Sequence, residues 1–101
     1  MQKRPKIPYG RQTISEEDIA SVIKVLRSDF LTQGPIVEVF AREVSRKINC
    51  KYSIPTNSAT SALHIAYLSL GLKKGDIIWS SPNTFVATTN TALHCGAQVD
   101  F

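Results

Sequence analysis

Short segments rich in β-favouring residues alternate with helix patterns over the second half of this 101-residue chain. Strands are predicted at 52–56, 77–81 and 97–101, and helices at 58–71 and 84–96. Strands that alternate with helices of this length are typical of βαβ units, whose strands run parallel in one sheet. Right-handed crossovers would place both helices on the same face of that sheet. The alternation therefore predicts an α/β fold with a βαβαβ order.

Two amphipathic helices are expected ahead of these units. In the first, Ser15 is placed as the N-cap with Asp18 three residues later, close to a capping box. Residues at helical spacing predict the apolar faces of the two helices, which are Ile19, Val22, Ile23 and Leu26 in the first and Val37, Phe40, Ala41, Val44 and Ile48 in the second. Between them, residues 28–35 form a loop by composition. Phe30 and Leu31 in this loop either fill a core or line a pocket, and the sequence favours the core.

The size and composition of the chain exclude several classes of protein. A chain of 101 residues makes one domain at most. It has no apolar run long enough for a membrane span and no signal peptide, so a cytoplasmic location without a membrane partner is expected. The net charge of +4 comes from scattered basic residues without a recognition motif, so no nucleic-acid partner is expected. Cys50 and Cys95 lie outside any metal-ligand spacing, which predicts free thiols and no metal site.

The last predicted strand stops at Phe101 and leaves the edge of the sheet unfinished. A three-stranded parallel sheet with such an edge is a poor place for a protein to end. The chain is therefore expected to be a fragment, with apolar surface left exposed.

Small hydroxyl residues gather where the predicted strand 52–56 runs into the helix that follows. Asn57, Ser58, Thr60 and Ser61 make up this cluster. Helix capping explains it and is the favoured interpretation, while a bound anion at the helix N-terminus is the alternative. A second polar segment, Asn83 to Phe85, follows the next strand, where Phe85 either covers a flat ligand or packs in the core.

Four segments in this order and spacing resemble the start of the DegT/StrS-type nucleotide-sugar aminotransferases. They are "IPYGRQTI", "SDFLTQGP", "NSATSALHIAYLSLG" and "SPNTFVATTNTALHCGAQVDF". The resemblance implies the first part of an aspartate-aminotransferase-like domain (fold type I) that uses pyridoxal 5′-phosphate (PLP). It further implies that residues 1–35 form an arm, a helix and a substrate loop, and that residues 36–101 begin the cofactor-binding α/β domain.

The resemblance also implies roles for individual residues. Ala59, Thr60 and Ser61 would bind the cofactor phosphate, and Phe85 would stack on its ring. The substrate-binding residues would be Tyr9, Asp29, Phe30, Leu31, Thr32 and Ala59. The substrates implied are L-glutamate and a UDP-linked keto sugar, and the assembly implied is a homodimer.

The catalytic residue of the family is expected to lie outside this chain. The resemblance places the Schiff-base lysine downstream of residue 101, so the 101-residue chain alone is expected to be inactive. Three alternatives stay open: a family member acting on another keto sugar, a dehydratase variant lacking the lysine, and a non-catalytic, truncated phosphate-binding remnant. His64 and His94 have no carboxylate or Cys partner at catalytic or metal spacing and are expected to be satisfied or half-exposed histidines.

Overall fold

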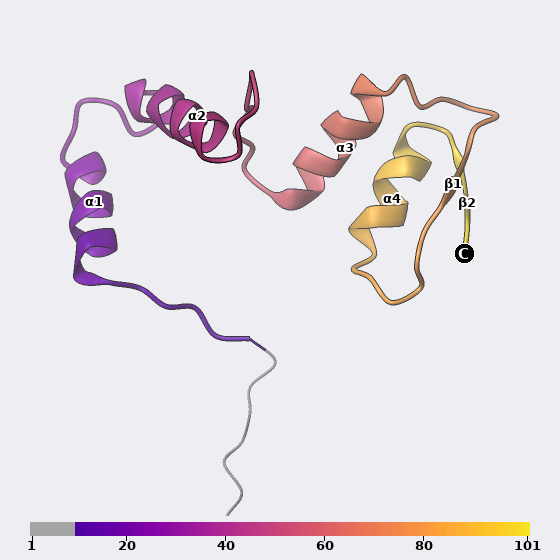
Figure 1. Ribbon diagram of the computed structural model, residues 1–101, viewed down its shortest axis with the longest axis horizontal. Coiled ribbons are helices and arrows are strands. Elements are labelled where there is room, and N and C mark those ends of the chain that lie inside the picture. The colour runs from indigo at the N-terminus through magenta and orange to yellow at the C-terminus, as the bar shows by residue number, and fades with distance from the viewer. Residues whose placement is uncertain (1–9) are drawn as a thin grey trace, which may run out of the picture. The chain divides into compact units, whose positions relative to one another are not determined.

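The computed structural model describes residues 10–101, in which helices and strands alternate toward the C-terminus (Figure 1). The elements are α1 (Glu16–Leu26), α2 (Pro35–Lys47), α3 (Ala59–Ser69), β1 (Ile77–Trp79), α4 (Ala87–His94) and β2 (Gln98–Asp100). Contacts divide the chain into a unit that ends at Phe40 and a second unit from Ala41 to Phe101. No helix within residues 10–101 combines the length and the apolar character needed to cross a membrane.

Helix α1 begins at the predicted capping box. The Ser15 Oγ accepts a hydrogen bond from the Asp18 N–H at 3.2 Å, and the Asp18 carboxylate accepts one from the Ser15 N–H at 2.8 Å. Glu16, Glu17 and Asp18 occupy the first turn, where negative charge is favoured by the helix dipole. None of the α1 residues is buried within this chain, so the predicted apolar face of the helix is formed but uncovered.

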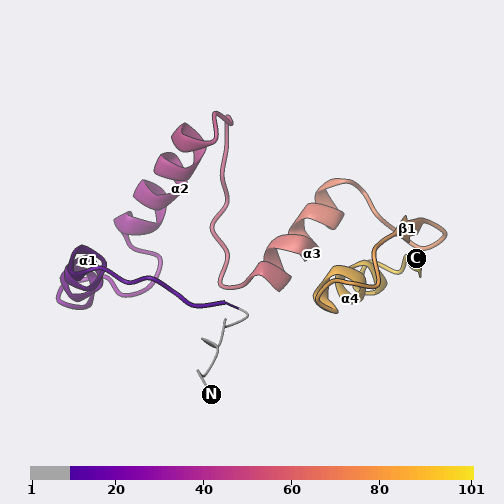
Figure 2. The same cartoon turned by 60° about the horizontal axis from the view of Figure 1, so that its bottom comes forward.

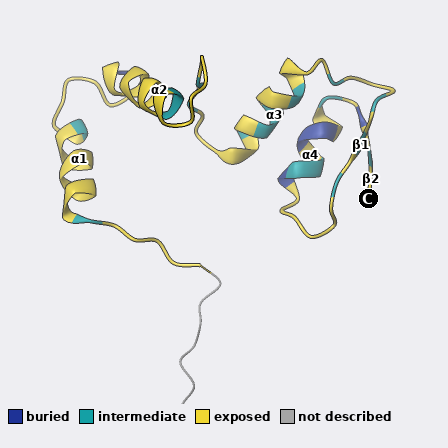
Figure 3. Cartoon of the chain, in the orientation of Figure 1, coloured by how far each residue is buried: buried dark blue, intermediate teal, exposed yellow. Residues whose placement is uncertain are grey.

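The second unit is organised around α4, which contacts α3 and β2. Helices α3 and α4 lie side by side in both views (Figures 1 and 2). Strands β1 and β2 pair in parallel with Ile78 opposite Val99. The buried residues of this unit are small, and Figure 3 shows them concentrated on α4. They are Ala87, Thr91, Ala92 and Ala97.

Glycine follows both helices of this unit, at the position where it commonly ends a helix. Gly71 follows α3 with a φ of +74°, and the Leu72 N–H donates to the Tyr67 carbonyl at 3.1 Å. Gly96 follows α4 with a φ of +83°, and the Ala97 N–H donates to the Ala92 carbonyl at 3.2 Å. Each glycine therefore adopts the left-handed conformation that turns the chain toward the sheet.

The α/β class with a parallel sheet is confirmed, but the predicted strand at 52–56 does not form. The sheet contains only β1 and β2 within residues 10–101. Among residues 10–101, residues 52–56 make no backbone–backbone hydrogen bond, and Pro55 lacks an N–H with which to make one. A segment with strand propensity still needs a neighbouring strand, and the part of the chain that the structure describes supplies none.

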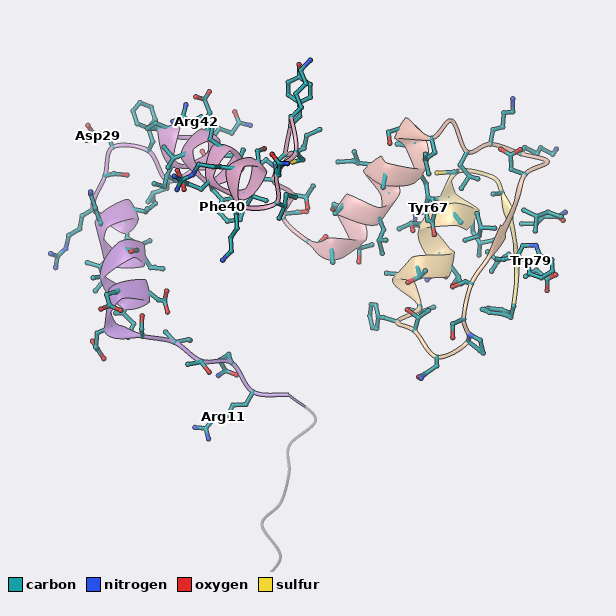
Figure 4. The ribbon with its side chains drawn as sticks, in the orientation of Figure 1. Arg11, Asp29, Phe40, Arg42, Tyr67 and Trp79 are labelled. Atoms are coloured by element: carbon teal, nitrogen blue, oxygen red, sulfur yellow. The ribbon has the colours of Figure 1, made fainter. Side chains whose placement is uncertain are left out.

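Two further expectations about this unit are corrected. Helix α4 begins at Ala87 instead of residue 84, because residues 81–86 form bends and a turn. The large apolar side chain of Trp79, in a predicted strand, favours packing in the sheet, yet it is 79% exposed and projects away from α4 (Figure 4).

Candidate functional site

The N-terminus of α3 is capped by a side chain of the predicted hydroxyl cluster. Ser58 is the N-cap residue, and its Oγ accepts a hydrogen bond from the Ser61 N–H at 3.1 Å. Its carbonyl accepts a second bond, from the Ala62 N–H at 3.1 Å. The capping interpretation of the cluster is therefore confirmed for Ser58.

The hydroxyl of Ser61 is held within the same cluster. The Ser61 Oγ donates to the Asn57 Oδ1 at 2.8 Å and lies 3.0 Å from the Ser58 Oγ. The Thr56 Oγ1 donates to the Ser58 carbonyl at 2.9 Å, which fixes the approach of the chain to the helix. Ser61 therefore has to exchange local bonds before it can donate to an anion.

Ala59 and Thr60 keep the donors that capping does not use. Within residues 10–101, their backbone N–H groups and the Thr60 hydroxyl have no hydrogen-bond partner, and both residues are exposed. Unpaired N–H groups at a helix N-terminus carry partial positive charge and bind phosphate readily. These donors fit a phosphate group.

No charged residue lies close in sequence to the N-terminus of α3. The first turn of α3 contains no acidic residue, in contrast to the three in α1. No Lys, Arg, Asp or Glu occurs between Tyr52 and Leu72. Within residues 52–72, therefore, no charged side chain neutralises the partial positive charge at the N-terminus of α3.

Phe85 lies in the loop that leads from β1 into α4. Its side chain is 75% exposed, so within this chain it is free to stand against a planar ligand and does not pack in a core. The hydroxyl of Thr84 in this loop lies 3.2 Å from that of Thr88 in the first turn of α4. No hydrogen bond links this loop to residues 57–61. Since residues 52–56 join no strand of the sheet within residues 10–101, strand pairing does not fix the position of one segment relative to the other.

The predicted substrate loop is exposed between α1 and α2. Phe30 and Leu31 are 60% and 64% exposed, so the expectation that they fill a core is wrong for this chain. Phe30 borders a mostly apolar groove of about 400 Å³, which Lys24, Val25 and Ile36 also line. The loop includes Asp29 (labelled in Figure 4) and Thr32. Tyr9 lies outside the described residues.

Gly34 permits the close turn of this loop. It is buried, and a Cβ at this position would lie 2.6 Å from the Phe30 Cβ. The next residue, Pro35, is the first of α2, where its missing N–H is not needed. The sequence indicates Gly34 only as a loop residue, and its role in placing Phe30 becomes visible in the structure.

Residues 10–101 contain no group of three or more His, Cys, Asp or Glu side chains arranged to hold a metal ion. Cys50 is exposed and Cys95 half-buried, and both are free thiols. The described residues thus offer donors for an anion at the start of α3. Phe85 and the loop at 28–35 are separate exposed segments.

Comparison with known proteins gives a consistent result. The sequence profile of the DegT/DnrJ/EryC1/StrS aminotransferase family matches residues 12–101. A UDP-4-amino-4,6-dideoxy-N-acetyl-beta-L-altrosamine transaminase of Campylobacter jejuni subsp. jejuni serotype O:23/36 (strain 81-176) is 43% identical over 95 residues, which cover 94% of this chain and 25% of the relative.

Solved structures show the same likeness. PseC of Helicobacter pylori, an aminotransferase involved in the biosynthesis of pseudoaminic acid, superposes with a TM-score of 0.86 at 32% identity, over 96% of this chain and 27% of that one. The PLP form of Spr1654 from Streptococcus pneumoniae superposes with a TM-score of 0.83 at 30% identity, over 93% of this chain and 24% of that one. The chain thus spans about a quarter of the length of the proteins it matches.

Proposed function

The chain belongs to the DegT/DnrJ/EryC1/StrS aminotransferase family, and we propose that the protein is a PLP-dependent nucleotide-sugar aminotransferase. It moves an amino group from L-glutamate to the C4 ketone of a UDP-linked 4-keto-6-deoxy sugar, in the biosynthesis of pseudaminic acid or a related cell-surface sugar. The observation that carries the proposal is the start of α3, where unpaired donors at Ala59 and Thr60 face solvent without a neighbouring carboxylate. The 43% identity to the altrosamine transaminase supports the choice of substrate.

Ala59, Thr60 and Ser61 bind the phosphate of PLP in this proposal. The backbone N–H groups of Ala59 and Thr60 and the Thr60 hydroxyl donate directly, since none of them has a partner within the described residues. Ser61 joins by turning its hydroxyl from Asn57 toward the phosphate. The helix dipole adds attraction for the doubly charged group.

Phe85 and the loop at 29–32 hold the rest of the ligands. Phe85 stacks on the cofactor ring with its exposed face and excludes water from that side. When bound, PLP supplies the electron sink through which the amino group is exchanged. Tyr9, Ala59 and the loop residues from Asp29 to Thr32 contact the nucleotide sugar.

We also propose that the whole protein works as a homodimer in the cytoplasm. The uncovered apolar face of α1 supports an assembly, because exposed apolar patches mark surfaces that other chains cover. The free thiols Cys50 and Cys95 are as expected in a reducing compartment.

A binding experiment with two matched ligands tests the phosphate site. The 101-residue chain is titrated with PLP and with pyridoxal, which lacks the phosphate, and the melting temperature is followed. PLP is expected to raise it and pyridoxal to raise it less. Thr60→Val keeps the side-chain volume but removes the hydroxyl donor, so it is expected to weaken PLP binding and leave pyridoxal binding unchanged. Equal effects of the two ligands, or a Thr60→Val chain that binds PLP normally, would contradict the proposal.

A further inference from the structure

Two imidazole rings from different helices meet where α3 and α4 pack together. His64 of α3 and His94 of α4 lie edge to face, with ring centroids 5.7 Å apart and an interplanar angle of 68°. They are the only two histidines of the chain. The two residues are distant in sequence, and only the packing of the helices brings them together.

The spacing of the two helices is fixed independently of this pair. The Tyr67 Oη donates to the Thr88 carbonyl at 3.1 Å across the same helix contact, and Tyr67 is labelled in Figure 4. His64 is half-buried and His94 is exposed, so the His94 ring has room to rotate. Neither α3 nor α4 contains an Asp, Glu, Lys or Arg, so no ionised side chain of these helices competes for the imidazoles.

We propose that His64 and His94 form a two-histidine site for Zn²⁺ or a similar late first-row divalent ion. Neutral imidazole is the commonest side-chain ligand for such ions. With a Zn–N bond of about 2.1 Å, the ion lies about 3.2 Å from each ring centroid, so coordinated rings have centroids about 5.2 Å apart at a tetrahedral angle and about 6.4 Å apart at most. The observed 5.7 Å falls between these limits, and in this proposal the exposed His94 ring leaves its edge-to-face position when the ion binds.

The site is open on its other sides. No third His, Cys, Asp or Glu completes a cluster within residues 10–101, so the ion keeps positions for water or an added ligand. Binding ties α3 to α4 and stabilises the folded state by mass action. His64 lies one helical turn after Thr60 on α3, and the inference does not depend on the aminotransferase proposal.

Calorimetric titration of the 101-residue chain with Zn²⁺ at neutral pH tests the site. One equivalent is expected to bind. Changes to residues that only support metal ligands cost about 10–100-fold in affinity, so His64→Gln and His94→Gln, which each remove one of two ligands, are expected to cost at least about 10-fold. A matched control is the double variant Leu93→His/His94→Leu, which keeps two histidines but moves one around α4. It is expected to lose as much affinity as His94→Gln.

Two further measurements keep the test decisive if a variant is less stable. Circular dichroism without metal compares the helix content of each variant with that of the native chain. Zn²⁺ is expected to raise the melting temperature of the native chain and of Cys95→Ser, but not that of the histidine variants. Absence of binding, full affinity in a single-histidine or exchanged variant, or loss of binding in Cys95→Ser would overturn the proposal.

Discussion

Ser58 and Thr60 lie two residues apart at the start of α3, but the structure gives them different tasks. The Ser58 Oγ caps the Ser61 N–H, whereas the Thr60 hydroxyl has no partner within the described residues. Ser58→Ala is expected to lower the free energy of unfolding by about 1 kcal/mol through loss of the cap. It also releases the Ser61 N–H for an anion, so the affinity for PLP is expected to be kept.

Urea unfolding and PLP titration of the two variants check this separation. Thr60→Val serves as the control, because it is expected to weaken PLP binding with little change in unfolding. A Ser58→Ala chain with native stability, or one that loses PLP binding while still folded, would show that the capping and binding roles are assigned to the wrong residues.

Asp18 links pH to the start of α1. The hydrogen bond from the Ser15 N–H, and after it the one from the Ser15 hydroxyl, lowers the pKa of the Asp18 carboxyl below its ordinary 3.8. Because the folded pKa is depressed, the carboxylate stabilises the helix start at pH values above 3.8. This contribution is lost as the pH falls through the folded pKa.

An NMR titration of the Asp18 carboxyl carbon is expected to give a midpoint below 3.8. In Ser15→Ala the midpoint is expected to move only part of the way back, since the backbone donor, which is the larger cause, remains. A midpoint at the ordinary value in the native chain, or a Ser15→Ala midpoint equal to the native one, would contradict this account.

At the scale of the elements, the glycines that end α3 and α4 form a natural comparison. Both have positive φ, but a Cβ at Gly71 would meet nothing within 4 Å, whereas one at Gly96 would lie 3.3 Å from the Lys74 backbone nitrogen. Gly71→Ala is expected to cost about 1–2 kcal/mol in unfolding free energy, from the left-handed conformation alone. Gly96→Ala is expected to cost more, because the backbone at Lys74 must also shift. Urea unfolding measures the free-energy cost of both substitutions. An equal or smaller cost for Gly96→Ala would show that the backbone at Lys74 shifts without a measurable penalty.

Elements whose signals are local are the ones that the sequence predicts well. The Ser15 and Ser58 caps and the glycines after α3 and α4 act over one helical turn, so a few neighbouring residues specify them. The strand expected at 52–56 needs a partner elsewhere in the chain, and its own residues cannot supply one. The same limit applies to Phe30 and Trp79, whose exposure depends on what else is available to cover them.

The candidate site likewise has a part that the sequence predicts and a part that it does not. The hydroxyl cluster at 57–61 could be predicted because its residues are neighbours in sequence. Whether each donor is free for an anion could not be predicted. Ser61 makes hydrogen bonds with Ser58 and Asn57, while Thr60 does not, and this difference depends on side-chain rotamers. The approach of His64 to His94 depends on helix packing and has no signal in the spacing of the two residues.

At the scale of the whole molecule, binding and catalysis are expected to separate. The proposed phosphate donors of α3 lie within this chain, whereas the nucleophilic lysine expected from the resemblance to the family would lie outside it. No lysine occurs between Tyr52 and Leu72, and Lys73 and Lys74 lie in the turn after α3, at the opposite end of the helix from the donors. The 101-residue chain is therefore expected to bind PLP without speeding the transfer of the amino group from L-glutamate.

Formation of 2-oxoglutarate from L-glutamate measures that transfer. Free PLP at the same concentration is the control, because the cofactor reacts slowly with amino acids by itself. The rate with the chain is expected to equal the rate with free PLP, even when the melting temperature shows that PLP is bound. A faster rate that disappears in Thr60→Val would mean that a residue of this chain performs the proton transfers assigned to the lysine. The proposal that α3 binds the phosphate while a lysine elsewhere in the protein transfers protons would then be wrong, since this chain would contain its own catalytic base.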